Sequence, residues 1–141
     1  MRVRDSSVVT SPKLSGKLIL VVDDDPDARE LMLRLLAITN ASILTACSAA
    51  EAFNFIREKS PNLLISDIGM PTEDGHELIR KVRSLPPESG GQTPAVALTA
   101  FAHSEDRQRA LGAGYQMQIA KPVESAKLLS VCASMIDGSA L

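Results

Sequence analysis

The sequence predicts an α/β domain in which five parallel strands form one open sheet with helices on both faces. Five short apolar runs alternate with five segments of helical character between residues 17 and 138. Such alternation is typical of strand–helix–strand units joined by right-handed crossovers. Five units are too few to close a barrel, so a doubly wound (βα)₅ sheet remains, with the expected strand order 2-1-3-4-5. Polar residues end four of the predicted strands, which fits the same architecture.

The first two strand–helix units occupy residues 18–60. Residues 18–22 (LILVV) form a short apolar run with two valines, typical of a strand that is buried on both faces. Pro26 suits the first turn of a helix that Asp24 or Asp25 caps. The apolar stripe of that helix falls at i, i+3, i+4, i+7 and i+8: Ala28, Leu31, Met32, Leu35 and Leu36. A weaker strand is expected at residues 42–46, before a helix that Ser48 caps and Pro61 stops.

The third and fourth units follow the same pattern. Residues 63–66 predict a strand that ends at Asp67, and a loop at residues 70–75 (MPTEDG) leads to a helix. The stripe of this helix is Leu78, Ile79 and Val82. A loop rich in Pro and Gly covers residues 85–94. A strand at residues 95–99 and a polar helix at about residues 104–111, ended by Gly112, complete the fourth unit.

The last unit is the least regular in composition. The strand at residues 116–120 is placed mainly by the alternation of the preceding elements. The final helix is clear from its stripe: Leu128, Val131, Cys132, Met135 and Ile136. Residues 1–16 are rich in Ser and show no periodicity, so we predict a flexible N-terminal tail or linker before a domain at residues 17–138.

Composition excludes several classes of function. The chain has 141 residues and a net charge of −2, without the basic surplus expected of a protein that binds nucleic acid directly. No apolar run is long enough to insert into a membrane, and the N-terminus lacks the apolar region of a signal peptide. Cys47 and Cys132 fit no metal spacing or disulfide framework, so both are expected to be small buried residues. These features favour a cytoplasmic protein.

The strand ends carry the residues with chemical potential. The first strand is followed by Asp23, Asp24 and Asp25, and later strands end at Asp67, Thr99 and Lys121. The carboxyl ends of parallel strands share one edge of the sheet, and ligands bind there where the strand order reverses. We therefore expect these carboxylates, the hydroxyl and the ammonium group to meet in one pocket.

This combination of groups suits phosphoryl transfer. Clustered carboxylates repel one another, and a hard cation such as Mg²⁺ (Mn²⁺ also qualifies) removes that conflict while it binds phosphate oxygens. The ammonium group and the hydroxyl fit the remaining phosphoryl oxygens. Asp67 stands alone at the central strand, and the acidic cluster after the first strand is better suited to the metal. Asp67 is therefore our choice for the carboxylate that accepts the phosphoryl group.

At this point the sequence resembles the receiver domain of two-component response regulators, which has a flavodoxin-like fold. The matching segments are ILVVDDDPDAREL, LLISDIGMPTEDGHEL, VALTAFA and GAGYQMQIAKPVE. The resemblance implies that Asp67 is the phosphoacceptor, and that Thr99 and Lys121 bind the phosphoryl group. It also implies that Asp23, Asp24, Asp67 and the backbone carbonyl of Gly69 hold Mg²⁺. A cis peptide bond before Pro122 is a further implication.

The resemblance also implies partners and a role. The phosphoryl group would come from a phosphohistidine on a histidine kinase or a histidine phosphotransfer domain, docked beside the first helix. The chain would be mainly a signalling domain that catalyses its own phosphorylation and dephosphorylation. The segments KLSGKLILVVDDD and GYQMQIAKPVE resemble receivers of hybrid histidine kinases, which favours that origin over a stand-alone regulator. The cognate partner and the oligomeric state stay open.

One departure from the family pattern concerns the switch. Gln118 occupies the position of the family's switch aromatic, and Tyr115 is nearby but out of register. We predict that signalling differs from the aromatic-switch scheme. Ala100 belongs to the same switch and tuning positions. Gly69 and Phe101 are predicted to tune the phosphoryl lifetime: Gly69 has no side chain to orient a water and Phe101 could cover the site, so slow self-dephosphorylation is expected.

Two other functions fit parts of the pattern. A haloacid-dehalogenase-like phosphatase would use Asp23 and Asp25 as its D-x-D motif, but it needs an acidic pair after the lysine, where only Glu124 and Asp137 follow. A degenerate receiver would act only as a binding module. His76 and His103 have no metal-ligand spacing and are predicted to lie on the surface.

Overall fold

A computed structural model of the chain describes residues 14–70, 74–100 and 104–137. Its sheet has five parallel strands in the order β3-β2-β4-β5-β6, which is the predicted order 2-1-3-4-5. The strands are β2 (Leu18–Val22), β3 (Ser42–Ala46), β4 (Leu63–Asp67), β5 (Ala95–Thr99) and β6 (Met117–Ala120). Each lies within two residues of its predicted bounds. The α/β fold class is therefore confirmed.

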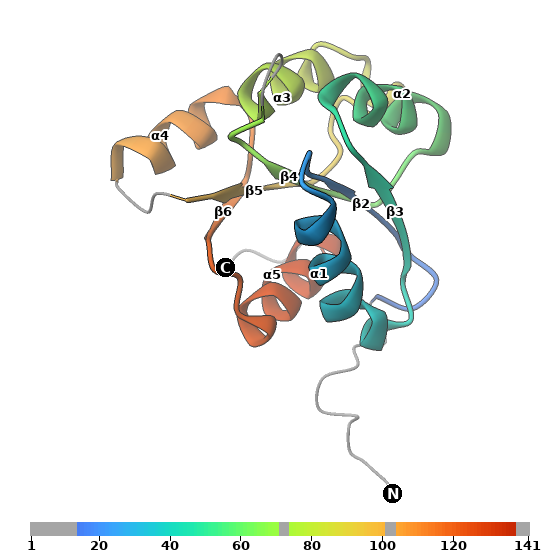
Figure 1. Ribbon diagram of the computed structural model, residues 1–141. Coiled ribbons are helices and arrows are strands. Elements are labelled where there is room, and N and C mark those ends of the chain that lie inside the picture. Colours follow the sequence, from blue (N-terminus) through green and yellow to red (C-terminus); the bar gives the residue numbers. More distant parts are fainter. Residues whose placement is uncertain (1–13, 71–73, 101–103, 138–141) are drawn as a thin grey trace, which may run out of the picture.

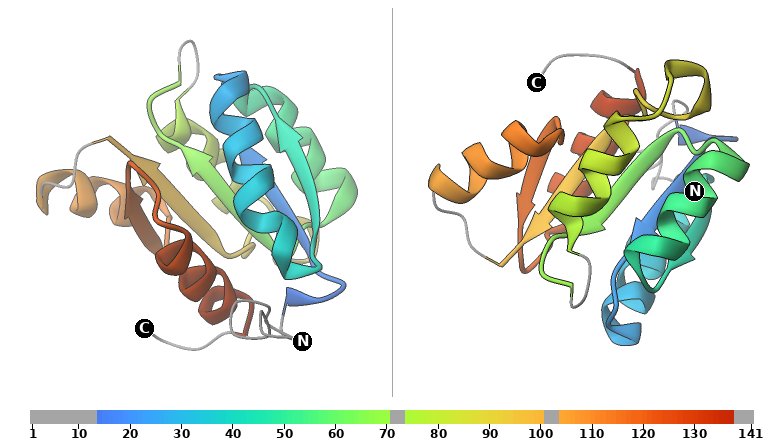
Figure 2. Two further views of the ribbon diagram at one scale, coloured as in Figure 1. Left: turned by 60° about the horizontal axis from the view of Figure 1, so that its bottom comes forward. Right: turned by 90° about the horizontal axis from the view of Figure 1, so that it is seen from above.

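Helices cover both faces of the sheet (Figure 1). They are α1 (Pro26–Leu36), α2 (Ala49–Lys59), α3 (Gly75–Arg83), α4 (Ser104–Ala113) and α5 (Ser125–Asp137). Two short 3₁₀ segments, η2 (Ala37–Thr39) and η3 (Pro87–Ser89), lie in the connections after α1 and α3. The two views of Figure 2 show that α1 and α5 share one face, whereas α2, α3 and α4 share the other.

The alternation of strand side chains divides the core into two layers. On β2, Leu20 and Val22 pack with the apolar residues of α2 and α3, whereas Ile19 and Val21 pack with those of α1 and α5. The central strands β4 and β5 are buried along their whole length. Because both faces of these strands are buried, a shift in strand register would disrupt the core on both sides of the sheet. The strand ends therefore keep fixed positions.

Local side-chain caps set the starts of three helices. Asp25, one of the two predicted caps, is the N-cap of α1, with Pro26 in the first turn. Ser48 caps α2 as predicted. Asp74, within the loop predicted at residues 70–75, is the N-cap of α3 and forms a capping box with Glu77. These caps satisfy backbone N–H groups that have no partner inside the helix.

Several predictions on burial were wrong. Leu31, predicted to lie on the buried stripe of α1, is 49% exposed, because only part of that stripe packs against the sheet. Cys47 is exposed, since it lies in the β3–α2 connection, whereas Cys132 is buried. Leu14 falls in the range predicted as a flexible tail, but its side chain is fully buried in the core against α1 and α5. The remainder of that range, residues 1–13, lies outside the described residues.

None of the described helices is both long enough and apolar enough to cross a membrane.

Candidate functional site

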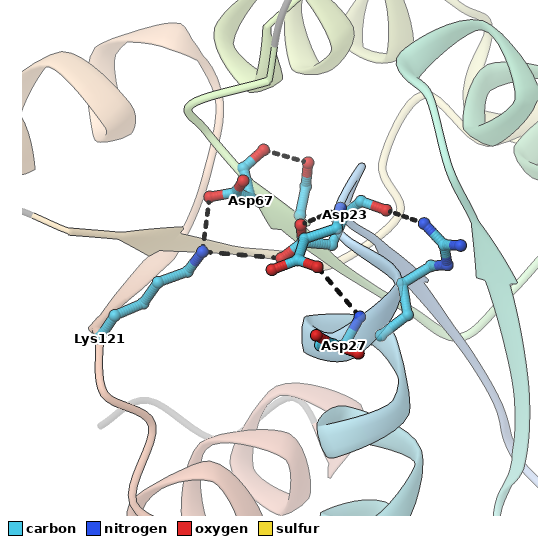
Figure 3. Close-up of polar contacts among 7 residues, drawn as sticks. Asp23, Asp27, Asp67 and Lys121 are labelled. Carbon is cyan, nitrogen blue, oxygen red and sulfur yellow. Dashed lines mark hydrogen bonds and ion pairs between the residues drawn. The ribbon is translucent and has the colours of Figure 1, made fainter.

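The predicted site residues meet at the carboxyl edge of the sheet. Asp23 follows β2, Asp67 and Thr99 end β4 and β5, and Lys121 follows β6. The Nζ atom of Lys121 lies 3.1 Å from Oδ1 of Asp67 and 3.6 Å from Oδ2 of Asp23. Figure 3 shows the lysine reaching across the strand ends toward both carboxylates. The topology thus brings together charges that are almost one hundred residues apart in sequence.

Three carboxylates form a group that could hold a metal ion. One oxygen from each of Asp23, Asp24 and Asp67 lies within 4.8 Å of the other two. Asp23 and Asp67 are buried, whereas Asp24 is exposed. Oδ2 of Asp23 is buried and accepts no hydrogen bond from the described residues. A donor set made only of oxygen atoms suits a hard divalent cation, so the donor chemistry fits Mg²⁺.

Burial and neighbouring charges shift the pKa values of Asp23 and Lys121. Burial raises the pKa of Asp23, and the neighbouring carboxylates of Asp67 and Asp24 add to this effect, whereas the backbone N–H of Asp25 and the ammonium group of Lys121 oppose it. Burial lowers the pKa of Lys121, but its contacts with Asp67 and Asp23 outweigh that effect and raise the pKa overall. Lys121 therefore carries its positive charge, and the negative charge on Asp23 is costly without a cation.

Backbone and side-chain hydrogen bonds fix the segment that carries Asp23. Its N–H donates to the carbonyl of Ala46 on β3, at 3.1 Å. Its Oδ1 accepts a 3.0 Å hydrogen bond from the backbone N–H of Asp25. Asp25 in turn accepts one from the N–H of Asp27, so these two acids serve the start of α1. Only Asp23 and Asp24 of the four acids at residues 23–27 join Asp67.

A pocket of about 560 Å³ opens over the phosphoacceptor candidate. Five of the predicted residues line it: Asp67, Gly69, Thr99, Ala100 and Lys121. Asp67 and Thr99 are 8% and 6% exposed. Gly69 is exposed, and a Cβ atom added to it would meet nothing within 4 Å. The pocket therefore has room for a phosphoryl group and for part of a donor.

Three polar residues that line this pocket were not predicted from the sequence: Asp74, His76 and Arg109. The prediction that His76 lies on the surface was wrong, because its side chain is 5% exposed in the first turn of α3. His76 stands three residues before the buried Ile79, so helical spacing places it beside the apolar stripe. That spacing was the signal that could have found it. His103 lies outside the described residues.

The switch positions differ in what the structure shows of them. Gln118 lies on β6 opposite Ala97 of β5, and its Oε1 atom is buried without a hydrogen bond from the described residues. Tyr115 precedes β6 and is buried. Phe101 lies outside the described residues. The peptide bond between Lys121 and Pro122 is cis, as the resemblance implied. No aromatic side chain occupies the position of Gln118, so the departure from the family pattern stands.

Residues 19–133 match the family of the response regulator receiver domain. The chain belongs to this family. The match begins at the second residue of β2 and includes the other four described strands, and all the strand-end residues described above fall inside it. Membership of this family argues against the haloacid-dehalogenase-like alternative. Of the two acids in the D-x-D motif of that alternative, Asp23 belongs to the candidate metal group and Asp25 caps α1.

Relatives include one protein that the match covers over most of its length and others that it covers over a small part. An uncharacterised 14.6 kDa protein in the sodA1 3′ region of Leptolyngbya boryana is 47% identical over 79% of this chain and 83% of its own length. The sensor histidine kinase RcsC of Salmonella typhimurium is 35% identical over 81% of this chain. The match covers only 12% of RcsC. The chain therefore corresponds to one domain of such kinases.

Solved structures agree with the fold. A response regulator from Chloroflexus aurantiacus superposes with a TM-score of 0.82 at 28% identity, covering 87% of this chain and 99% of that one. The receiver domain of sensor histidine kinase PA1611 from Pseudomonas aeruginosa gives a TM-score of 0.79 at 27% identity, again covering 87% and 99%. A magnesium ion is coordinated in the active-site cleft of the latter structure.

Proposed function

We propose that this receiver domain accepts a phosphoryl group on Asp67 in a Mg²⁺-dependent transfer from a phosphohistidine, and that phosphorylation changes its binding to partners. One observation carries the proposal: the ammonium group of Lys121 lies 3.1 Å from Asp67, next to a group of three carboxylates that could hold a metal. If Asp67 had only a structural role, one positive charge such as that of Lys121 would be enough to balance it. A metal-binding group of carboxylates beside it would not be needed.

The residues divide the work of the transfer. A carboxylate oxygen of Asp67 attacks phosphorus, the P–O bond forms as the P–N bond to the donor imidazole breaks, and the departing nitrogen keeps the electron pair. Lys121 pairs with a phosphoryl oxygen, and the Thr99 hydroxyl donates to another. Asp23, Asp24, Asp67 and the carbonyl of Gly69 would hold Mg²⁺, which supplies positive charge to the phosphoryl oxygens.

The donor is a histidine kinase or a histidine phosphotransfer domain. The chain matches a small part of RcsC and a similarly small part of hybrid signal transduction histidine kinase D from Dictyostelium discoideum, 12% and 8% of their lengths. These relatives support an origin in, or a partnership with, a hybrid kinase. A cytoplasmic location follows from this proposal, because the phosphohistidine donor is made with ATP inside the cell.

Incubation with acetyl phosphate and Mg²⁺ tests the proposal. The intact mass of the protein should rise by one phosphoryl group, and the gain should vanish in Asp67→Asn and in the presence of a chelator. Asp27→Asn, which alters an exposed acid of the same segment outside the metal group, is the matched control and should be phosphorylated like the wild type.

Two results would contradict the proposal. An unchanged mass of the wild-type protein, with Mg²⁺ present, would leave a degenerate receiver that only binds partners. Steady turnover of a phosphate ester that is lost in Asp23→Asn but retained in Asp67→Asn would instead indicate a phosphatase with its nucleophile after β2.

A further inference from the structure

The segment of residues 114–116, between α4 and β6, holds α3 at both ends. At the C-terminal end of the helix, Nε of Arg83 donates to the carbonyl of Gly114 at 2.9 Å and Nη2 donates to Oε1 of Gln116 at 3.0 Å. At the N-terminal end, the hydroxyl of Tyr115 donates a 2.7 Å hydrogen bond to the carbonyl of Gly75. The segment that leads into β6 therefore holds both ends of α3, the helix that follows β4.

Tyr115 makes its contact in a fully enclosed setting. Its side chain is 2% exposed, and burial raises the pKa of its hydroxyl well above the ordinary value, so the hydroxyl stays a donor. The side chain of Ser66 lies near this hydroxyl and partly opposes the effect of burial on its pKa. Ser66 precedes the phosphoacceptor candidate and donates to the carbonyl of Asp67 at 3.0 Å. Tyr115 thus bonds to the first residue of α3 and shares a core cluster with Leu64 of the strand that carries Asp67.

Gly75 is the residue through which this contact reaches the site. Its N–H donates to the carbonyl of Ile68 at 3.0 Å, which closes the base of the connection between β4 and α3. The backbone is so close that a Cβ atom on Gly75 would lie 2.7 Å from the carbonyl oxygen of Asp67. Gly69, whose carbonyl is a proposed metal ligand, follows directly after Ile68. The position of Gly75 therefore constrains the backbone at residues 67–69.

We propose that Tyr115 is a positioning residue for the metal site, because its hydroxyl holds the carbonyl of Gly75 and thereby fixes the backbone that presents Asp67 and Gly69. This inference rests on the proposed function, in which the Gly69 carbonyl is a metal ligand. It gives the aromatic residue before β6 a role different from that of a rotating switch. A buried carbonyl that loses its donor must find another partner or open to water, and either change loosens the base of the connection.

Tyr115→Phe removes only the hydroxyl and keeps the ring in the core. We expect the Mg²⁺ dissociation constant, measured by titration calorimetry without a phosphodonor, to rise about 3- to 10-fold, toward the range seen when residues that orient metal ligands are changed. Saturating Mg²⁺ should restore most of the rate of phosphorylation by acetyl phosphate, since Tyr115 acts through metal binding and touches no reacting atom. The amide of Gly75 should exchange with deuterium faster.

Thr39→Val is the matched control. Thr39 is fully buried, and its hydroxyl donates a 2.7 Å hydrogen bond to the carbonyl of Leu36 in the connection between α1 and β3, at the opposite edge of the sheet. This variant removes a comparable buried hydrogen bond, together with the one that the hydroxyl accepts from the N–H of Ala41. It should leave the Mg²⁺ dissociation constant and the Gly75 exchange rate unchanged.

The possible outcomes separate this inference from the proposed function. Unchanged Mg²⁺ affinity in Tyr115→Phe, or an equal loss of affinity in Thr39→Val, would overturn the positioning role while leaving phosphorylation of Asp67 intact. A wild-type protein that binds no Mg²⁺ would overturn both. Weaker Mg²⁺ binding in Tyr115→Phe alone, with faster exchange at Gly75, supports the positioning role.

Discussion

The guanidinium group of Arg29 donates a 2.8 Å hydrogen bond to the main-chain carbonyl of Asp23. This bond ties the first turns of α1 to the end of β2, at the residue whose carboxylate is the most buried member of the acidic group. Since the backbone on the other side of Asp23 is held by the carbonyl of Ala46, the residue is fixed on both sides before any metal binds.

Arg29→Ala is therefore expected to lower the free energy of unfolding by about 1.5–3 kcal/mol, the usual cost of losing a partly buried hydrogen bond from a charged group. Urea denaturation followed by circular dichroism measures the change. Arg34→Ala on the same helix is the control. Arg34 pairs with Glu30 at 2.8 Å, but both side chains are more than 60% exposed, so this variant should cost only about 0–1 kcal/mol. Equal losses in the two variants would contradict the anchoring role of Arg29.

Asp23→Asn should stabilise the protein in metal-free buffer. Burial and the neighbouring carboxylates raise the pKa of Asp23, which means that folding disfavours its charged form. The amide keeps an oxygen for the N–H of Asp25 and removes the charge, so we expect the melting temperature to rise by roughly 3–6 °C, equivalent to about 1 kcal/mol in a domain of this size.

The same variant should lose its response to metal. Mg²⁺ should raise the melting temperature of the wild type and of Asp27→Asn, but not that of Asp23→Asn, because a ligand that binds only the folded state stabilises it. A lower melting temperature of Asp23→Asn without metal would show that the ion pair with Lys121 outweighs the cost of burying the carboxylate.

The strands and their polar ends could be predicted from sequence because both depend on local pattern and on topology. An apolar run such as residues 63–66 marks a buried strand, and parallel strands bring their carboxyl ends to one edge, so Asp67 and Lys121 had to lie close together. The contact of Tyr115 with Gly75 spans 40 residues and depends on how α3 packs on the segment before β6, which no local pattern encodes. His76 was wrongly predicted to lie on the surface, because the prediction gave more weight to its polar side chain than to its helical spacing.

Gly75→Ala should destabilise the fold although alanine is the better helix former. An added Cβ atom would lie 2.7 Å from the carbonyl oxygen of Asp67 and 2.8 Å from Cα of Ile68, and backbone atoms cannot move aside as a side chain can. We expect a loss of about 1–3 kcal/mol in the free energy of unfolding, as for other overpacked sites. Gly112→Ala is the control, because it lies in α4 with open space around the added atom; there alanine should stabilise by up to about 1 kcal/mol. Matching signs for the two variants would refute the close approach of Gly75 to β4.

Gly69→Asn should shorten the lifetime of the phosphorylated form. Gly69 lines the pocket beside Asp67 and has open space where a side chain would begin, so an asparagine fits without displacing a neighbour and can orient a water toward phosphorus. We expect the wild-type acyl phosphate to persist for many minutes. The variant should lose it about tenfold faster, which is a small part of the rate enhancement that a well-positioned polar group can give. Loss of radiolabel from protein freed of phosphodonor measures both rates. Gly69→Ala, which adds a side chain without a polar group, should decay like the wild type. A wild-type half-life of seconds would show that the site already positions its water without help from residue 69.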